Sequence, residues 1–241
     1  MANLSELMGG GSVSGILDEQ VFDASGTWTK HEDAAAGDIV EIEMHGAAGG
    51  GYSYSGSGRY VWSGQPGSYV RFRVFARHLA ASQPVIVGSG GAPNGGSGGG
   101  TEFAGVFLQG GSGGYYDVDY PTSTFNNAFV PRISSAIDWR AMDVYDAQIG
   151  NNSTETGYRP ALFFMCGGSA GYFRDSSIGY RKDTLFGGKA GDIRDRSGNV
   201  QGTRGTFDGE NPGGSGGATA SGTAGKGGNG RVIIRVLKGA A

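Results

Sequence analysis

The feature that most constrains this chain is a strand-like segment joined directly to a run of glycines. Residues 38–51 read DIVEIEMHGAAGGG, and in their first half three apolar residues alternate with two glutamates. Alternation with a period of two is typical of a strand that buries one face. The same join recurs in residues 84–91 and, in reverse order, in residues 225–237. These joins predict a framework of strands that carries a packed glycine-rich layer.

Glycine accounts for 50 of the 241 residues, roughly three times its usual share. Only seven prolines accompany it, and no Gly-X-Y register runs through the sequence, so a collagen helix is excluded. Aromatic residues make up 11% of the chain, and together with the strand-like segments they supply much apolar surface to bury. That surface argues against a disordered chain.

The glycine tracts are predicted to be ordered, because they are short and strands interrupt them. Glycine costs more backbone entropy to fix than any other residue, and it allows one backbone to pack directly against another. Polyproline-II helices have no internal hydrogen bonds, so glycine versions can stack and bond to one another. We therefore predict a mainly β fold: a β-sandwich-like strand framework carrying a layer of glycine-rich polyproline-II-type helices, with long irregular loops. Flexible linkers are the alternative interpretation of the tracts.

The chain divides into a short N-terminal segment and one long domain. Residues 1–20 are mixed in character and hinged by glycine, and they predict a peptide that attaches to a larger assembly, with a frayed terminus as the alternative. Residues 21–241 form the glycine-rich β domain. Within it, residues 133–150 place apolar side chains near helical spacing and end in Gly150, which predicts a short helix.

Charge and hydropathy exclude several classes of partner. The net charge is −3, with Lys and Arg scattered along the chain, whereas a nucleic-acid-binding protein usually has a basic face. No apolar run approaches the roughly 20 residues needed to span a bilayer, and the N-terminus lacks the pattern of a signal peptide. We therefore expect no nucleic acid, no membrane insertion and synthesis in a cytoplasm.

No set of residues indicates catalysis, a metal or a cofactor. His31, His45 and His78 lack metal-ligand spacing, and Cys166 has no Cys-x-x-Cys partner. Glycine motifs of the nucleotide-binding type follow from composition alone. Further carboxylates gather at Asp117 and Asp119 and at Asp138, Asp143 and Asp146, where a solvated surface is the simpler interpretation. We expect a protein that is not an enzyme and that has no cofactor and no metal.

Aromatic side chains in the loops are the strongest candidates for binding. Tyrosine and tryptophan provide a large, rigid contact area at low entropic cost, and binding loops therefore favour them. About half of such residues in a fold of this kind are expected to belong to the core instead. The candidate binding residues are Tyr52, Tyr54, Tyr60, Trp62, Tyr115, Tyr116 and Tyr120.

The order of motifs along residues 21–238 resembles the glycine-rich domains of bacteriophage tail-fibre and tail-tip proteins. The opening matches at Gly26, Thr27, Trp28 and Thr29, and the glycine run matches at Gly46 to Gly51. The closing motif matches at Gly227, Gly228, Gly230, Val232, Ile233 and Ile234, whereas His31 departs from the proline that is frequent in the family. The alternation of glycine motifs and loops is also similar to that of the tip adhesins of long phage fibres, in which polyglycine helices form a sandwich.

The resemblance implies a location, a function and partners. It implies a virion protein of the tail fibre or another exterior appendage that binds a host-surface glycan or outer-membrane protein. The distal loops implied are residues 52–63, 115–159, 172–186 and 192–201. Residues 1–20 would contact other virion or fibre proteins, and a homotrimer is compatible because fibres are commonly trimeric. Two alternatives are a structural head or tail decoration without a receptor and, on Asp117 and Asp119, a glycan depolymerase.

Overall fold

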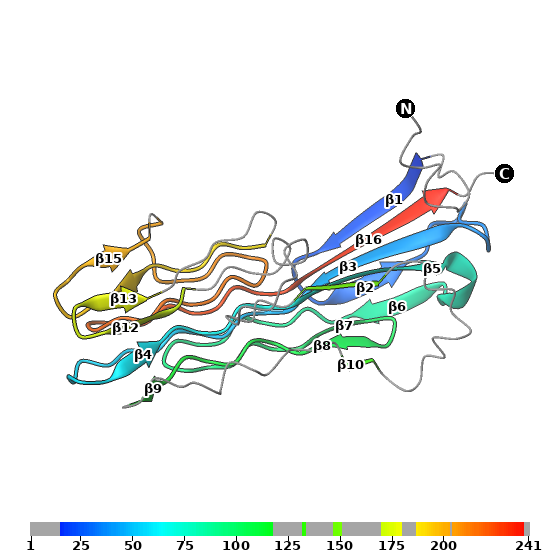
Figure 1. Ribbon diagram of the computed structural model, residues 1–241. Helices are drawn as coiled ribbons and strands as arrows, with labels where there is room; N and C mark the ends of the chain where they lie inside the picture. The colour runs from blue at the N-terminus through cyan, green and yellow to red at the C-terminus, as the bar shows by residue number, and fades with distance from the viewer. Residues whose placement is uncertain are drawn as a thin grey trace.

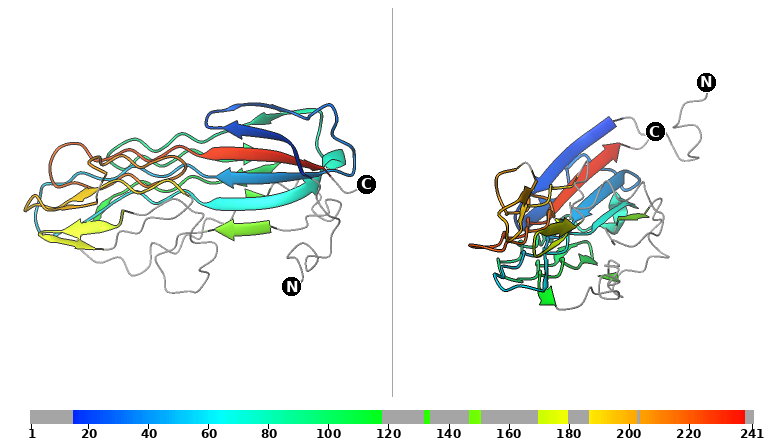
Figure 2. Two further views of the ribbon diagram at one scale, coloured as in Figure 1. Left: turned by 90° about the horizontal axis from the view of Figure 1, so that it is seen from above. Right: turned by 60° about the vertical axis from the view of Figure 1, so that its left-hand side comes forward.

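The computed structural model describes residues 15–117, 132–133, 147–150, 170–179, 187–202 and 204–238. The molecule is elongated (Figure 1). At one end lies the largest sheet, where β1 begins and β16 ends, and we call this end the base. Glycine-rich segments run side by side from the base to the opposite end, where small β-hairpins form what we call the tip (Figures 1 and 2).

The largest sheet has five antiparallel strands in the order β1-β16-β3-β5-β11. They are β1 (Gly15–Phe22), β16 (Arg231–Lys238), β3 (Ile39–His45), β5 (Tyr69–Phe75) and β11 (Ala147–Gly150). The period-two alternation in β3, β5 and β16 matches their burial, since every second residue is buried on the inner face. The strands predicted from this alternation are therefore confirmed.

Two smaller sheets complete the base. One pairs β2 (Gly26–Thr29) with β6 (Ser82–Val85), and the other has the order β10-β8-β7. The strands of the second are β10 (Arg132–Ile133), β8 (Val106–Leu108) and β7 (Thr101–Phe103), and a 3-10 turn at Ala76–His78 follows β5. Among the described residues there is no α-helix, so the prediction of a mainly β fold is confirmed.

The hydrophobic core of the base lies between the five-stranded sheet and these smaller sheets. Trp28 on β2 is fully buried, and its ring meets that of Phe103 on β7 edge-on, with centroids 5.7 Å apart. The large sheet contributes Val40, Ile42, Met44, Val70, Phe72, Val74, Val232, Ile234 and Val236. The Gly-Thr-Trp-Thr motif therefore places a tryptophan at the centre of this core.

The glycine run after β3 lies at the centre of the glycine-rich region. Three successive N–H groups bond three different segments: Gly49 donates to Gln65 O at 2.9 Å, Gly50 to Gly96 O at 2.9 Å, and Gly51 to Gly225 O at 2.8 Å. The carbonyls of the same three residues accept from Gly216, Gly114 and Gly95. The backbone entropy that glycine loses is thus offset by a backbone with hydrogen bonds on several sides.

These contacts leave no room for side chains. A Cβ on Gly49 would lie 1.9 Å from the carbonyl oxygen of Ser112, and one on Gly51 would lie 2.1 Å from that of Gly217. Since real Cβ contacts are never this short, any larger residue would push the segments apart. The glycines of this region are packed against one another and are not linkers.

The tip contains a four-stranded sheet and a short hairpin. The sheet has the order β13-β12-β4-β9, formed by β13 (Ser177–Gly179), β12 (Tyr172–Arg174), β4 (Tyr60–Trp62) and β9 (Tyr116–Asp117). The hairpin pairs β14 (Ile193–Arg194) with β15 (Val200–Gln201). A second, smaller core lies here and includes Val61, Phe173 and Ile193.

One predicted element differs from the structure, and part of another lies in a strand. The helix expected across residues 133–150 is wrong at both ends, because Arg132–Ile133 and Ala147–Gly150 are strands. Ala147–Gly150 pairs with β5, whose open edge offers hydrogen bonds that a helix could not use. Residues 15–20, which the prediction assigned to an attachment peptide, belong to β1 and pair with β16. Residues 1–14 and 134–146 lie outside the described part of the chain.

Candidate binding site

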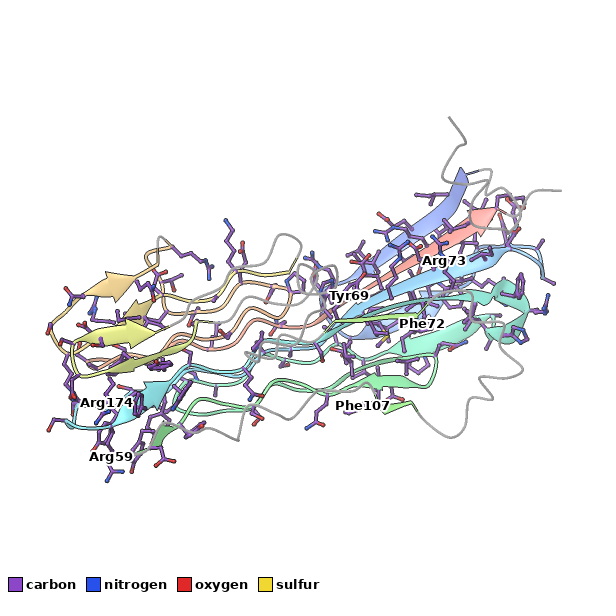
Figure 3. All side chains as sticks on the ribbon, viewed as in Figure 1. Arg59, Tyr69, Phe72, Arg73, Phe107 and Arg174 are labelled. Carbon is purple, nitrogen blue, oxygen red and sulfur yellow. The ribbon has the colours of Figure 1, made fainter. Side chains whose placement is uncertain are left out.

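The tip brings together three of the four predicted loops. Residues 52–63 contain β4, residues 172–179 form the β12–β13 hairpin, and residues 192–201 form the β14–β15 hairpin. In Figure 3, Arg59 and Arg174 mark this end and Arg73 marks the base. The loop predicted at 115–159 is not confined to the tip, because it contributes β9 to the tip sheet but β10 and β11 to sheets of the base.

One face of the tip sheet has a row of aromatic rings. Strand register places Tyr172 opposite Trp62, and their centroids are 4.6 Å apart. Tyr60 lies on the same face, 5.5 Å from Tyr172, and Tyr115 stacks on Trp62 at 6.1 Å. Trp62 is only 4% exposed, so it packs beneath the tyrosines. The half-buried tyrosines form the accessible part of the row.

A second aromatic group lies beside the other face of the sheet. Tyr116 is paired with Val61, which puts its ring on the face opposite to Tyr60. Tyr54 stacks on Tyr116 at 4.4 Å, and Tyr52 lies 5.4 Å from it. Tyr116 is 41% exposed, which makes it the most accessible ring of the group and a candidate for contact with a ligand.

Arginines cover a ring in each group. The guanidinium of Arg174 lies 4.7 Å from the centre of the Tyr60 ring, and its Nη1 donates to the Tyr60 hydroxyl at 3.0 Å. Arg59 lies over Tyr116 at 5.4 Å. Arginine stacked on tyrosine presents N–H donors beside an apolar ring, a combination that suits a ligand with both polar and flat apolar surfaces.

Asp175 ties the three loops of the tip together. Its Oδ1 accepts from the Gly58 backbone N–H at 3.0 Å and also from Arg196, so it links residues 52–63, its own hairpin and residues 192–201. The Gly58 hydrogen bond, followed by the charge of Arg196, lowers the pKa of Asp175 despite some desolvation. The relative positions of the loops therefore depend on this carboxylate.

Two buried aspartates, on either side of β14, have structural roles at the β14–β15 hairpin. Asp192 accepts the backbone N–H of Gly205 at 2.8 Å, and Asp195 accepts that of Asn199 at 2.9 Å. Both are 2% exposed. Because their oxygens bind backbone N–H groups of the loops, they order the turns and are poorly placed to contact a ligand.

The predicted residues thus differ in how accessible they are. The structure gathers Tyr52, Tyr54, Tyr60, Trp62, Tyr115 and Tyr116 at the tip, whereas Tyr120 lies outside the described residues. Sequence reasoning missed Tyr172, Arg59 and Arg174. Tyr172 did stand at the start of a predicted loop, but only the register with β4 shows that it faces Trp62.

Other kinds of site are not found in the part of the chain that the structure describes. No three His, Cys, Asp or Glu side chains gather in a group that could hold a metal ion there. The described residues also include no helix that is long and apolar enough to cross a membrane. Asp119, Asp138, Asp143, Asp146 and Cys166 lie outside those residues.

The fold and the tip define a mainly β protein in which a glycine-rich region separates a sheet from a group of aromatic loops. Residues 23–237 match the glycine-rich domain family, and the chain belongs to this family. The match covers most of the chain and includes both the tryptophan motif and the closing strand. A comparison with curated proteins gave no match.

Proposed function

We propose that this protein is an exterior component of a bacteriophage virion, in the tail fibre or tail tip, and that its tip binds a receptor on the host surface. The observation that carries the proposal is the separation of the two ends. The strands β1 and β16 begin and end at the base, and the aromatic loops lie at the opposite end (Figure 1). An elongated molecule attached at its base would present these loops outward.

The receptor would be a host-surface glycan or an outer-membrane protein. The tip offers tyrosine rings with arginine N–H donors beside them, and Tyr116 is accessible. Each such contact is weak, so affinity would depend on several copies acting together on one particle. A homotrimer, as in many fibres, would supply them.

We also infer that the glycine segments are polyproline-II-type helices that form the rigid body of this appendage. Successive N–H groups of Gly49, Gly50 and Gly51 bond segments in different directions, as expected for three residues per turn. Such a body would hold the tip at a fixed distance from the virion. Cryo-electron microscopy of the particle would test both the geometry and the location of the protein.

Binding to intact cells of candidate hosts tests the receptor proposal. Labelled purified protein should bind saturably, and the double variant Tyr54→Ala/Tyr116→Ala should lose most of that binding while remaining folded. Ile86→Ala is a matched control, because Ile86 is 46% exposed but lies outside the tip. Equal binding by the double variant, or no binding to cells that the parent particle infects, would contradict a receptor function.

The alternative is a structural virion component whose loops contact neighbouring subunits. The exposed strand β1 at the edge of the largest sheet supports it, since such an edge can pair with another chain. Labelling of intact particles with antibodies against the tip separates the two proposals. A receptor-binding tip is accessible on the particle, whereas a tip engaged with other subunits is covered.

A further inference from the structure

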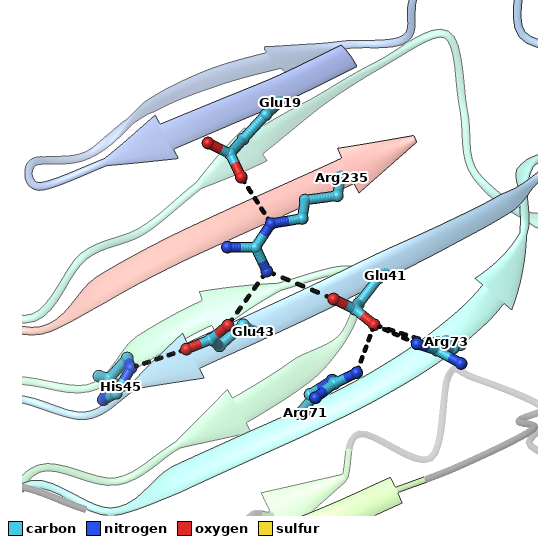
Figure 4. Close-up of polar contacts among 7 residues, drawn as sticks. All are labelled: Glu19, Glu41, Glu43, His45, Arg71, Arg73 and Arg235. Carbon is cyan, nitrogen blue, oxygen red and sulfur yellow. Dashed lines mark hydrogen bonds and ion pairs between the residues drawn. The ribbon is translucent and has the colours of Figure 1, made fainter. Parts of the chain in front are cut away.

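The outer face of the five-stranded sheet alternates acidic and basic strands. β3 contributes Glu41 and Glu43, and its neighbour β5 contributes Arg71 and Arg73. On the other side, β16 contributes Arg235, which is paired in register with Glu41 of β3 and with Glu19 of the edge strand β1. The order β1-β16-β3-β5 is therefore acidic, basic, acidic, basic (Figure 4).

An acidic strand inside the sheet has cations on both sides. Glu41 Oε2 accepts from Arg71 Nη2 at 2.7 Å and from Arg73 Nε at 2.8 Å, both on β5. Its Oε1 accepts from Arg235 Nη1 on β16 at 3.3 Å. With partners on both sides, the Glu41 side chain is only 8% exposed.

Glu19 of β1 and Asp23, directly after β1, have a cation on one side only, within the part of the chain that is described. Glu19 Oε2 accepts from Arg235 Nε at 2.5 Å, and Asp23, directly after β1, accepts from Arg231 Nε at 2.6 Å. Both cations belong to β16. The Glu19 and Asp23 side chains remain 43% and 55% exposed.

The edge of β1 has little of the protection that exposed edges usually have. No backbone-to-backbone hydrogen bond joins it to a described strand other than β16. Its eight residues include neither lysine nor proline, and the protection that it does have comes from the charges of Asp18 and Glu19 and one irregularity between Ile16 and Asp18. Ile16 and Val21 are 61% and 50% exposed beside this edge.

We propose that the free edge of β1 binds an extended segment of another protein in which basic and apolar side chains alternate along one face, as Arg231, Ile233, Arg235 and Leu237 do on β16. Added as a sixth strand, this segment hydrogen-bonds the backbone of β1. Its basic side chains lie beside Glu19 and Asp23 and continue the alternation of charge. Its apolar side chains cover Ile16 and Val21.

This chain itself offers no such segment in its described part. The basic strands β5 and β16 each already lie between two strands, and residues 1–14 contain no Lys or Arg. We therefore assign the edge to a segment of a different protein, and occupation by a second copy of this chain is an outcome that the test distinguishes. The inference rests on the proposed function only in assigning attachment to the base, and its test uses neither cells nor a receptor.

The test uses a fluorescein-labelled peptide with the sequence RVIIRVLK, that of residues 231–238, because this sequence already pairs antiparallel with β1 on its other side. Fluorescence anisotropy should report saturable binding to the whole protein, and hydrogen exchange should slow at amides of residues 15–22. The acidic counterpart EVIIEVLE should not bind. Glu19→Lys/Asp23→Lys should weaken binding about tenfold or more, through lost ion pairs and new repulsion.

Glu102→Lys is the control for a single charge reversal, since it makes the same charge change as Glu19→Lys alone but on β7, in another sheet. A second test uses peptides N-methylated on every other residue and requires no protein variant. Methylation of the N–H groups that face β1 should abolish binding, whereas methylation of those on the opposite edge of the peptide should preserve it. Absence of binding, equal binding of both peptides, or insensitivity to the double charge change would overturn the proposal. A dimer seen by sedimentation with its β1 amides protected would show that a second copy occupies the edge instead.

Discussion

The ring of Tyr54 stacks on the ring of Tyr116, with centroids 4.4 Å apart and 9° between the planes. The two residues come from separate segments of the chain, one before β4 and the other on β9. Arg59 lies over the same Tyr116 ring. The candidate binding surface is therefore assembled by the fold and does not exist in either segment alone.

The exposure of Tyr116 predicts that its loss affects binding more than stability. Tyr116→Ala should lower the free energy of unfolding by about 1 kcal/mol, the value of an aromatic pair. Phe173→Ala, in the fully buried core of the tip, should cost about 3–5 kcal/mol. Urea unfolding of both variants tests this difference. Equal losses would identify the Tyr54–Tyr116 stack as core and not as a contact surface.

The glycine-rich region predicts an unusual sensitivity to single methyl groups. Gly49→Ala places a Cβ 1.9 Å from a backbone oxygen, and backbone cannot move aside cheaply. The variant should therefore lower the free energy of unfolding by about 3 kcal/mol or more, at or above the upper range for overpacking. Gly37→Ala is the matched control, since its Cβ meets no atom within 4 Å, and it should change stability by less than about 1 kcal/mol. Thermal unfolding gives both values. If Gly49→Ala were tolerated as well as Gly37→Ala, the glycine segments would not be tightly packed.

The strands were predictable because their signal is local. Alternating apolar residues in β3 and β5 place one face against the core regardless of which strand lies beside them. The order of the tryptophan motif, glycine run and closing strand was enough to predict the glycine-rich family. The phage assignment is not tested by that match and remains a proposal.

Pairing between distant segments was not predictable. Gly49, Gly50 and Gly51 bond three different segments, but glycine tracts are so alike in sequence that nothing local specifies which tract meets which. The position of Tyr172 against Trp62 likewise depends on the register of β12 with β4. In residues 147–150, the open edge of β5 determined the structure and apolar spacing did not.

The position of Trp28 predicts that the tryptophan motif acts through packing. Trp28→Ala should lower the free energy of unfolding by about 3–5 kcal/mol, because it empties a fully buried site against Phe103. Thr27→Ala, at an exposed neighbouring position, should change it by less than about 0.5 kcal/mol. Denaturant unfolding measures both. A small effect of Trp28→Ala together with lost cell binding would instead indicate a contact role.

The acidic residues of β3 predict that the protein loses stability in acid. Burial acts to raise the pKa of Glu41, but hydrogen bonds from Arg73 and Arg71 and their charges outweigh it and lower the pKa overall. The His45 hydrogen bond is the main cause that lowers the pKa of Glu43. A carboxyl whose pKa is lower in the folded than in the unfolded state stabilises the protein at pH values above 4.5, its ordinary pKa. That contribution is lost as the pH falls below 4.5.

The free energy of unfolding should therefore decrease as the pH falls below 4.5, and Glu41→Gln should change the size of this decrease. At neutral pH the variant should be less stable by about 1.5–3 kcal/mol, the range for hydrogen bonds to charged groups. The difference should shrink in acid, because protonated Glu41 then resembles glutamine. Glu32→Gln, at an exposed position, should change stability by less than about 0.5 kcal/mol at every pH. Urea unfolding at a series of pH values measures these free energies. If the difference between wild type and Glu41→Gln stayed constant with pH, the arginine contacts would not depend on the charge of Glu41.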